Sequence, residues 1–144
     1  MLRLVIQLTI AVLVVSLGTR LLRLARQSGG EPERWLGAFF CFAGAALALS
    51  PVGAQLGAHE TLGRALLILG QGSTTLGLVC LVRFNWQLFR PDSKAARNFA
   101  IFCSVLDIGT FVGVAWIGIG TAMQSDFGHL FVFSRFLILS LIHI

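Results

Sequence analysis

The chain has 144 residues, of which 56% are hydrophobic, 12% are charged and none is tyrosine, and its formal net charge is +5. A soluble domain carries about 25% charged residues, so this composition excludes an ordinary soluble domain. Uncharged runs cover 4–19, 35–58 and 65–82, and a fourth run, 98–125, is interrupted only by Asp107. A helix needs about 20 apolar residues to cross a bilayer. The sequence therefore predicts an all-α transmembrane helical bundle of four complete spans and a truncated fifth.

The first span is predicted at 4–24. It ends in Arg20, Arg23 and Arg26, whose spacing places them on one side of the helix, where long side chains reach the headgroups. No small-x-small cleavage site follows the apolar stretch, so we expect a retained helix rather than a cleaved signal peptide. The polar segment 27–33 contains Gly-Gly and Pro and predicts a turn.

The second span is predicted at 35–54. It is rich in glycine and alanine, which allow helices to approach one another closely in lipid. Pro51 and Gly53 are helix breakers, so we expect them to interrupt the end of this span.

The third span is predicted at 62–84. Glycines recur every seven residues, at Gly63, Gly70 and Gly77, and this spacing predicts a groove for a neighbouring helix. Polar side chains lie near the middle of the span, and they should face protein because lipid cannot hydrogen-bond them. Among them are Gln71, Thr74 and Thr75.

The fourth span is predicted at 98–122, with Gly109 and Gly113 forming a G-x-x-x-G packing pair. An incomplete fifth span follows at 129–138. The last six residues, 139–144, read L-S-L-I-H-I and resemble a translated sequencing-library adapter. We therefore leave them out of the fold and expect 1–138 to be a single transmembrane domain, a fragment of a longer chain.

The basic residues predict the orientation of the chain. Eight of the eleven flank the loops at 25–34 and 90–97. By the positive-inside rule these loops are cytoplasmic and the N-terminus is outside. Trp35 and Trp86 then lie at the inner interface, and Trp116 lies toward the outer half. The net positive charge thus mainly reflects the topology of the chain in the membrane. The sequence shows no basic soluble face, so we expect no nucleic-acid partner.

Asp107 is the most informative single residue, because an acid inside a span is costly, by about 2.5 to 3.5 kcal/mol, and is a candidate functional site. One interpretation is a proton-carrying or cation-binding carboxylate. The other, which we favour, is a structural aspartate that is neutral or hydrogen-bonded to Gln71, Thr74 or Thr75. On that interpretation Asp107→Asn preserves folding. Counting residues places Arg135 at a different depth, so we expect its side chain to snorkel outward, with pairing as the alternative.

Other reactive residues fit no motif. His59, Glu60 and His129 fall in the predicted outer loops, but their spacing matches no metal-binding pattern. The three cysteines lie in different spans without a C-x-x-C, so we expect free thiols. We therefore expect no metal, no cofactor and no catalytic site.

Three segments resemble an uncharacterised group of bacterial multi-pass membrane proteins with seven helices. They are Leu21-Leu-Arg-Leu-Ala-Arg26, Glu31-Pro-Glu-Arg-Trp-Leu-Gly37 and Phe84-Asn-Trp-Gln-Leu-Phe-Arg-Pro-Asp-Ser93. The resemblance implies an inner-membrane protein and carries no activity with it.

Two functions follow from these patterns. The first is a non-enzymatic integral membrane module, sensory or scaffolding in kind, whose partners are the bilayer and either a cytoplasmic protein or a C-terminal domain beyond residue 138. The alternative is a transporter or proton-coupled permease with a midplane polar site around Asp107. Transporters favour interrupted helices and internal repeats, and the sequence offers no convincing repeat.

Overall fold

The computed structural model describes residues 2–57 and 60–117, together with Val132 and Arg135. Over this part the chain is helical, with no strand, and forms α1 (Leu2–Ser28), α2 (Glu31–Leu56), α3 (Thr61–Phe89) and α4 (Lys94–Ile117). All four helices are long and apolar enough to cross a membrane. These findings confirm the predicted all-α class with four helices of spanning length. The predicted fifth span and the segment 139–144 lie outside the described residues, apart from Val132 and Arg135.

The helices extend beyond the predicted apolar spans. The third begins at Thr61 and ends at Phe89, and the fourth begins at Lys94. A hydropathy count finds only the part that suits hydrocarbon, whereas backbone hydrogen bonds continue the helix into the polar flanks. The first helix ends where Gly29 adopts a φ of +70° and donates its backbone N–H to the Ala25 carbonyl at 3.0 Å. Glycine adopts this left-handed conformation without steric penalty, which explains the break.

Pro51 does not interrupt the second helix. The expected break at Pro51 and Gly53 is wrong, because α2 continues through both residues to Leu56. A proline removes one backbone donor and crowds the carbonyl four residues earlier. In apolar helices neighbouring helices and local adjustments accommodate this defect, and here Gly53 is packed directly against α3.

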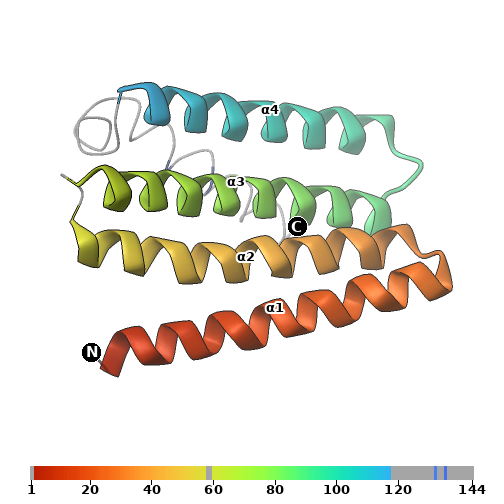
Figure 1. Cartoon of the computed structure of the whole chain (residues 1–144). Coiled ribbons are helices and arrows are strands. Elements are labelled where there is room, and N and C mark those ends of the chain that lie inside the picture. Colours follow the sequence, from red (N-terminus) through yellow and green to blue (C-terminus); the bar gives the residue numbers. More distant parts are fainter. Residues whose placement is uncertain (1, 58–59, 118–131, 133–134, 136–144) are drawn as a thin grey trace.

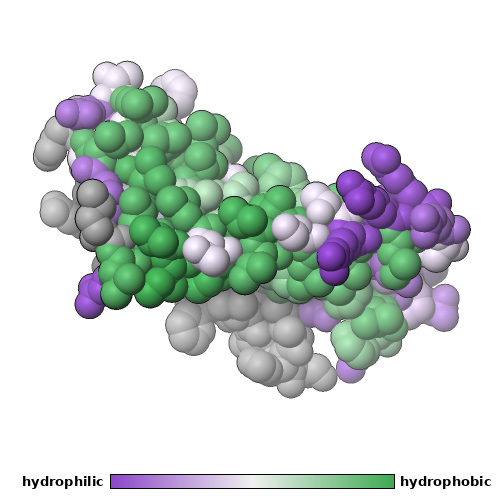
Figure 2. All heavy atoms as spheres, turned by 60° about the horizontal axis from the view of Figure 1, so that its bottom comes forward, coloured by the Kyte–Doolittle hydropathy of each residue, from purple (hydrophilic) through white to green (hydrophobic). Residues whose placement is uncertain are grey.

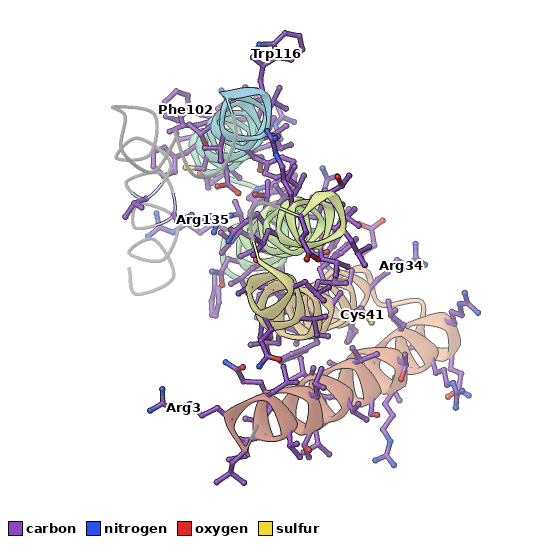
Figure 3. The ribbon with its side chains drawn as sticks, turned by 60° about the vertical axis from the view of Figure 1, so that its left-hand side comes forward. Arg3, Arg34, Cys41, Phe102, Trp116 and Arg135 are labelled. Atoms are coloured by element: carbon purple, nitrogen blue, oxygen red, sulfur yellow. The ribbon has the colours of Figure 1, made fainter. Side chains whose placement is uncertain are left out.

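The four helices lie side by side in one layer, in chain order (Figure 1). The second helix packs extensively against α1 and α3, and α4 makes a smaller contact with α3. The oblique view in Figure 3 shows the same order, with α1 at one edge and α4 at the other. The described helices therefore form an open row rather than a closed bundle. Short connections explain the order, because they join antiparallel neighbours.

Glycines bring α1 and α2 into backbone contact. A Cβ at Gly18 would lie 2.8 Å from the Gly37 carbonyl oxygen and 2.8 Å from the Cys41 backbone nitrogen. A Cβ at Gly44 would lie 3.0 Å from the Ala11 carbonyl oxygen. Only a residue without a side chain fits at such a distance from a neighbouring backbone.

The glycine series at Gly63, Gly70 and Gly77 is buried on α3 and faces α2 over about four turns. A Cβ at Gly63 would lie 3.1 Å from the Gly53 carbonyl oxygen, and a Cβ at Gly70 would lie 3.1 Å from the Ser50 backbone nitrogen. At Gly77 the approach is less close, because a Cβ there would lie 3.5 Å from the Phe42 Cβ. The groove that the spacing predicts is thus occupied by α2.

The G-x-x-x-G pair of α4 is arranged differently. Gly109 is exposed, and a Cβ there would meet nothing within 4 Å among the described residues, while Gly113 is half-buried. The buried face of α4 instead repeats at intervals of three and four residues. It consists of Ala100, Cys103, Asp107, Thr110 and Val114.

The outer surface of the layer is mostly apolar. Figure 2 shows hydrophobic residues covering the middle of one face, with hydrophilic residues gathered toward the two ends. Large apolar side chains such as Leu13, Leu69 and Phe102 are more than half exposed. A soluble protein rarely exposes so large an apolar area, whereas a lipid environment stabilises it.

Candidate functional site

Asp107 is completely buried, with 0% of its surface exposed. It lies roughly halfway along α4, on the face that packs against α3. Buried polar neighbours in the described chain are Thr75 on α3 and Thr110 one turn further along α4. An ionised carboxylate in such surroundings requires a partner of opposite charge or several hydrogen bonds.

Arg135 supplies that partner. Its Nε lies 3.8 Å from Oδ1 of Asp107, and 19% of its side chain is exposed. The same guanidinium donates from Nη1 to the Gln71 side-chain oxygen at 3.0 Å. From Nη2 it donates to the Thr75 hydroxyl at 3.2 Å and to the Gln71 backbone carbonyl at 3.5 Å. Figure 3 shows Arg135 directed toward the helical row from one side.

The network joins three parts of the chain. Asp107 comes from α4, and Gln71 and Thr75 come from α3 at a spacing of four residues, which places them on one helix face. The fork of donors on an arginine can bind a carboxylate and neighbouring oxygens at once. One guanidinium thus bridges α3 and α4 and ties the chain at Arg135 to both helices.

The structure brings together three of the four predicted site residues. Gln71, Thr75 and Asp107 meet at Arg135. Thr74 is separate, because its hydroxyl donates to the Gly70 carbonyl of its own helix at 3.1 Å. Thr110 likewise donates to the backbone carbonyl of Asp107, at 3.0 Å, rather than to the carboxylate.

The expectation that Arg135 snorkels outward is wrong. It rested on counting residues along spans that were assumed to be perpendicular to the membrane. That count ignores helix tilt and the length of an arginine side chain, whose stem can carry the charged group well away from its own backbone. The informative signal was an arginine and an aspartate in neighbouring apolar segments, since such residues usually pair.

The described residues contain no group of three or more side chains suited to a metal ion. Of the three loop residues that we considered for metal binding, Glu60 is exposed just before α3. His59 and His129 lie outside the described residues. Cys41, Cys80 and Cys103 are free thiols, and the last two are buried among apolar residues, where thiols behave as small hydrophobic groups.

The four apolar helices fit a membrane-embedded protein. No known protein family, curated protein or solved structure matches the chain. The function must therefore be argued from the polar network and from the distribution of charge along the helices.

Proposed function

We propose that the chain is a non-enzymatic, multi-pass integral membrane module of a sensory or scaffolding kind, located in the inner membrane of a bacterium. Four helices long enough to cross the membrane support this proposal. The connections from α1 to α2, at Gly29–Gly30, and from α3 to α4, at 90–93, are too short to hold a soluble catalytic domain.

The observation that carries the proposal is the internal neutralisation of Asp107 by Arg135. A guanidinium that is bound to a carboxylate and to oxygens of two α3 residues acts as a bridge between segments. This arrangement suits a module whose helices must keep a fixed arrangement. In a sensory module, the partner that receives the signal is either a cytoplasmic protein or a domain beyond residue 138.

Transport is the competing function, and Asp107 would be its proton carrier. A carrier's carboxylate must exchange its proton with water, whereas Asp107 is completely buried and lies against the Arg135 guanidinium. Discontinuous helices are typical of transporters, whereas α2 is continuous through Pro51. The polar network therefore favours the structural role over transport.

Proton flux in proteoliposomes distinguishes the two functions. The chain is reconstituted into vesicles that contain a pH-sensitive dye, and a pH gradient and a membrane potential are imposed. We expect flux no greater than that of protein-free vesicles, and the same for Asp107→Asn. A flux that disappears in Asp107→Asn and persists in Thr74→Val would refute the proposal, because among the described residues the Thr74 hydroxyl bonds to the Gly70 carbonyl of its own helix.

A further inference from the structure

Arg83 lies against two tryptophans near the end of α3. Its guanidinium carbon is 4.9 Å from the centre of the Trp35 ring on α2 and 5.7 Å from that of Trp86 on α3. Both rings are half-buried, while Arg83 itself is exposed. Cation–π attraction at these distances holds the guanidinium in place.

Among the described residues, Arg83 forms no ion pair with a carboxylate. The ion pair of the described residues joins Arg135 to Asp107, at a distant point of α3 and α4. Two carboxylates lie in the first turn of α2, those of Glu31 and Glu33, and Glu31 accepts a hydrogen bond from the Gln87 side chain at 2.8 Å. The two indole rings therefore hold the Arg83 guanidinium at a fixed position.

The surrounding end of the molecule is basic. The α1–α2 and α3–α4 connections lie at this end, which is on the right in Figure 1. Eight basic side chains and three acidic ones belong to it, and the basic ones are Arg20, Arg23, Arg26, Arg34, Arg83, Arg90, Lys94 and Arg97. This set, called the basic end below, attracts anions.

An apolar stripe leads away from Arg83 along α3. Leu69, Leu76 and Arg83 are spaced by seven residues, which places them on nearly the same helix face. Leu69 is 58% exposed and Leu76 is 45% exposed. The face therefore offers a cation at one end and about 20 Å of exposed apolar helix beyond it.

We propose that Arg83, with Trp35 and Trp86, binds the headgroup phosphate of an anionic phospholipid of the phosphatidylglycerol type. The planar guanidinium suits a phosphate, to which it can donate two hydrogen bonds. The indoles place the site at the level of the headgroups, where tryptophan prefers to lie. An acyl chain then follows Leu76 and Leu69, which a free phosphate would not use.

Fluorescence quenching by brominated lipids tests this site directly. In Trp116→Phe, which removes an exposed tryptophan at the far end of α4, the two remaining tryptophans both adjoin Arg83. The protein is placed in phosphatidylcholine nanodiscs that contain a minor fraction of brominated phosphatidylglycerol or, in parallel, brominated phosphatidylcholine. We expect the anionic lipid to be enriched about fivefold over phosphatidylcholine around the two indoles. This ratio corresponds to the attraction between one basic side chain and anionic lipid.

Three further variants distinguish a specific site from a general attraction of the basic end for anions. Arg83→Gln should lose most of the enrichment, whereas Lys94→Gln, which removes the same charge from the same end, should keep most of it. Arg83→Lys keeps the charge without the planar fork and should show an intermediate value. Equal quenching by the two lipids, an equal loss in Arg83→Gln and Lys94→Gln, or full enrichment in Arg83→Lys would overturn the proposal.

Discussion

Asp107 and Arg135 affect stability mainly because each compensates the buried charge of the other. A charge placed near the centre of a membrane helix costs about 2.5 to 3.5 kcal/mol on insertion scales. Pairing with additional hydrogen bonds offsets this penalty, so that the intact pair contributes little net stability while a broken pair destabilises strongly. The bonds from Arg135 to Gln71 and Thr75 therefore matter as much as the ion pair itself.

A double-mutant cycle measures this dependence. We expect Arg135→Met to lower the free energy of unfolding by about 3 to 5 kcal/mol, because it leaves Asp107 buried without its counter-charge. Asp107→Asn should also destabilise, since the guanidinium loses its anion. The double variant should be more stable than the sum of the two effects predicts, by about 1 to 3 kcal/mol. Reversible unfolding from mixed micelles by SDS gives all three values.

Thr74→Val is the control for this cycle, because in the described part of the chain the Thr74 hydroxyl bonds to the Gly70 carbonyl of its own helix. Its effect should simply add to that of Arg135→Met. Additive effects of Asp107→Asn and Arg135→Met would contradict the bridge.

At this scale the sequence identifies most of the polar network. Asp107, Gln71 and Thr75 stand out as polar residues inside apolar runs, and the need to satisfy them inside the protein predicts that they meet. The sequence does not predict how they meet. A count along one helix gives depth but not lateral position, so the count that put Asp107 near the middle of its span separated it from Arg135, which contacts it.

At the scale of elements, glycines determine how closely the helices pack. The contacts at Gly18 and Gly37, and at Gly53 and Gly63, bring backbones together, which increases dispersion contacts where no hydrophobic effect drives association. The fourth helix packs through larger side chains, among them Leu78 and Val82 of α3.

A matched pair of alanine substitutions tests this difference. Gly18→Ala introduces a Cβ about 2.8 Å from two backbone atoms of α2, and we expect a loss of about 1 to 3 kcal/mol from overpacking. Gly109→Ala adds the same group in open space, and the higher helix propensity of alanine should leave stability unchanged or raised by up to about 1 kcal/mol. Thermal unfolding in detergent compares them. Equal effects would show that the α1–α2 contact does not depend on glycine.

The existence of the helices is predictable because their uncharged runs are long and distinct. The ends of the helices and their arrangement are less predictable from the sequence. Pro51 reads as a break in the sequence, yet the packing of Gly53 against α3 keeps α2 continuous. The order of the helices depends on which faces carry glycines. The G-x-x-x-G pattern at Gly109 predicts close packing, yet a Cβ there would meet nothing within 4 Å among the described residues.

At the scale of the whole molecule, charge is distributed unevenly between the two ends. The basic end carries eight of the eleven basic residues, whereas Arg3, Arg64 and Glu60 belong to the opposite end. Such a bias orients a membrane protein with its basic loops toward the cytoplasm. The same end carries the proposed Arg83 site, so the proposed orientation and the proposed lipid contact both depend on the attraction between basic residues and anionic headgroups.

Cysteine accessibility in intact cells tests most directly whether the helices cross the membrane in this orientation. In a background without Cys41, Cys80 and Cys103, single cysteines replace Glu60, just before α3, and Ser93, in the connection between α3 and α4 at the basic end. We expect a membrane-impermeant maleimide to label Glu60→Cys rapidly and to label Ser93→Cys only after permeabilisation. Rapid labelling of Ser93→Cys in intact cells would contradict the orientation, and rapid labelling of both would contradict a membrane-crossing α3.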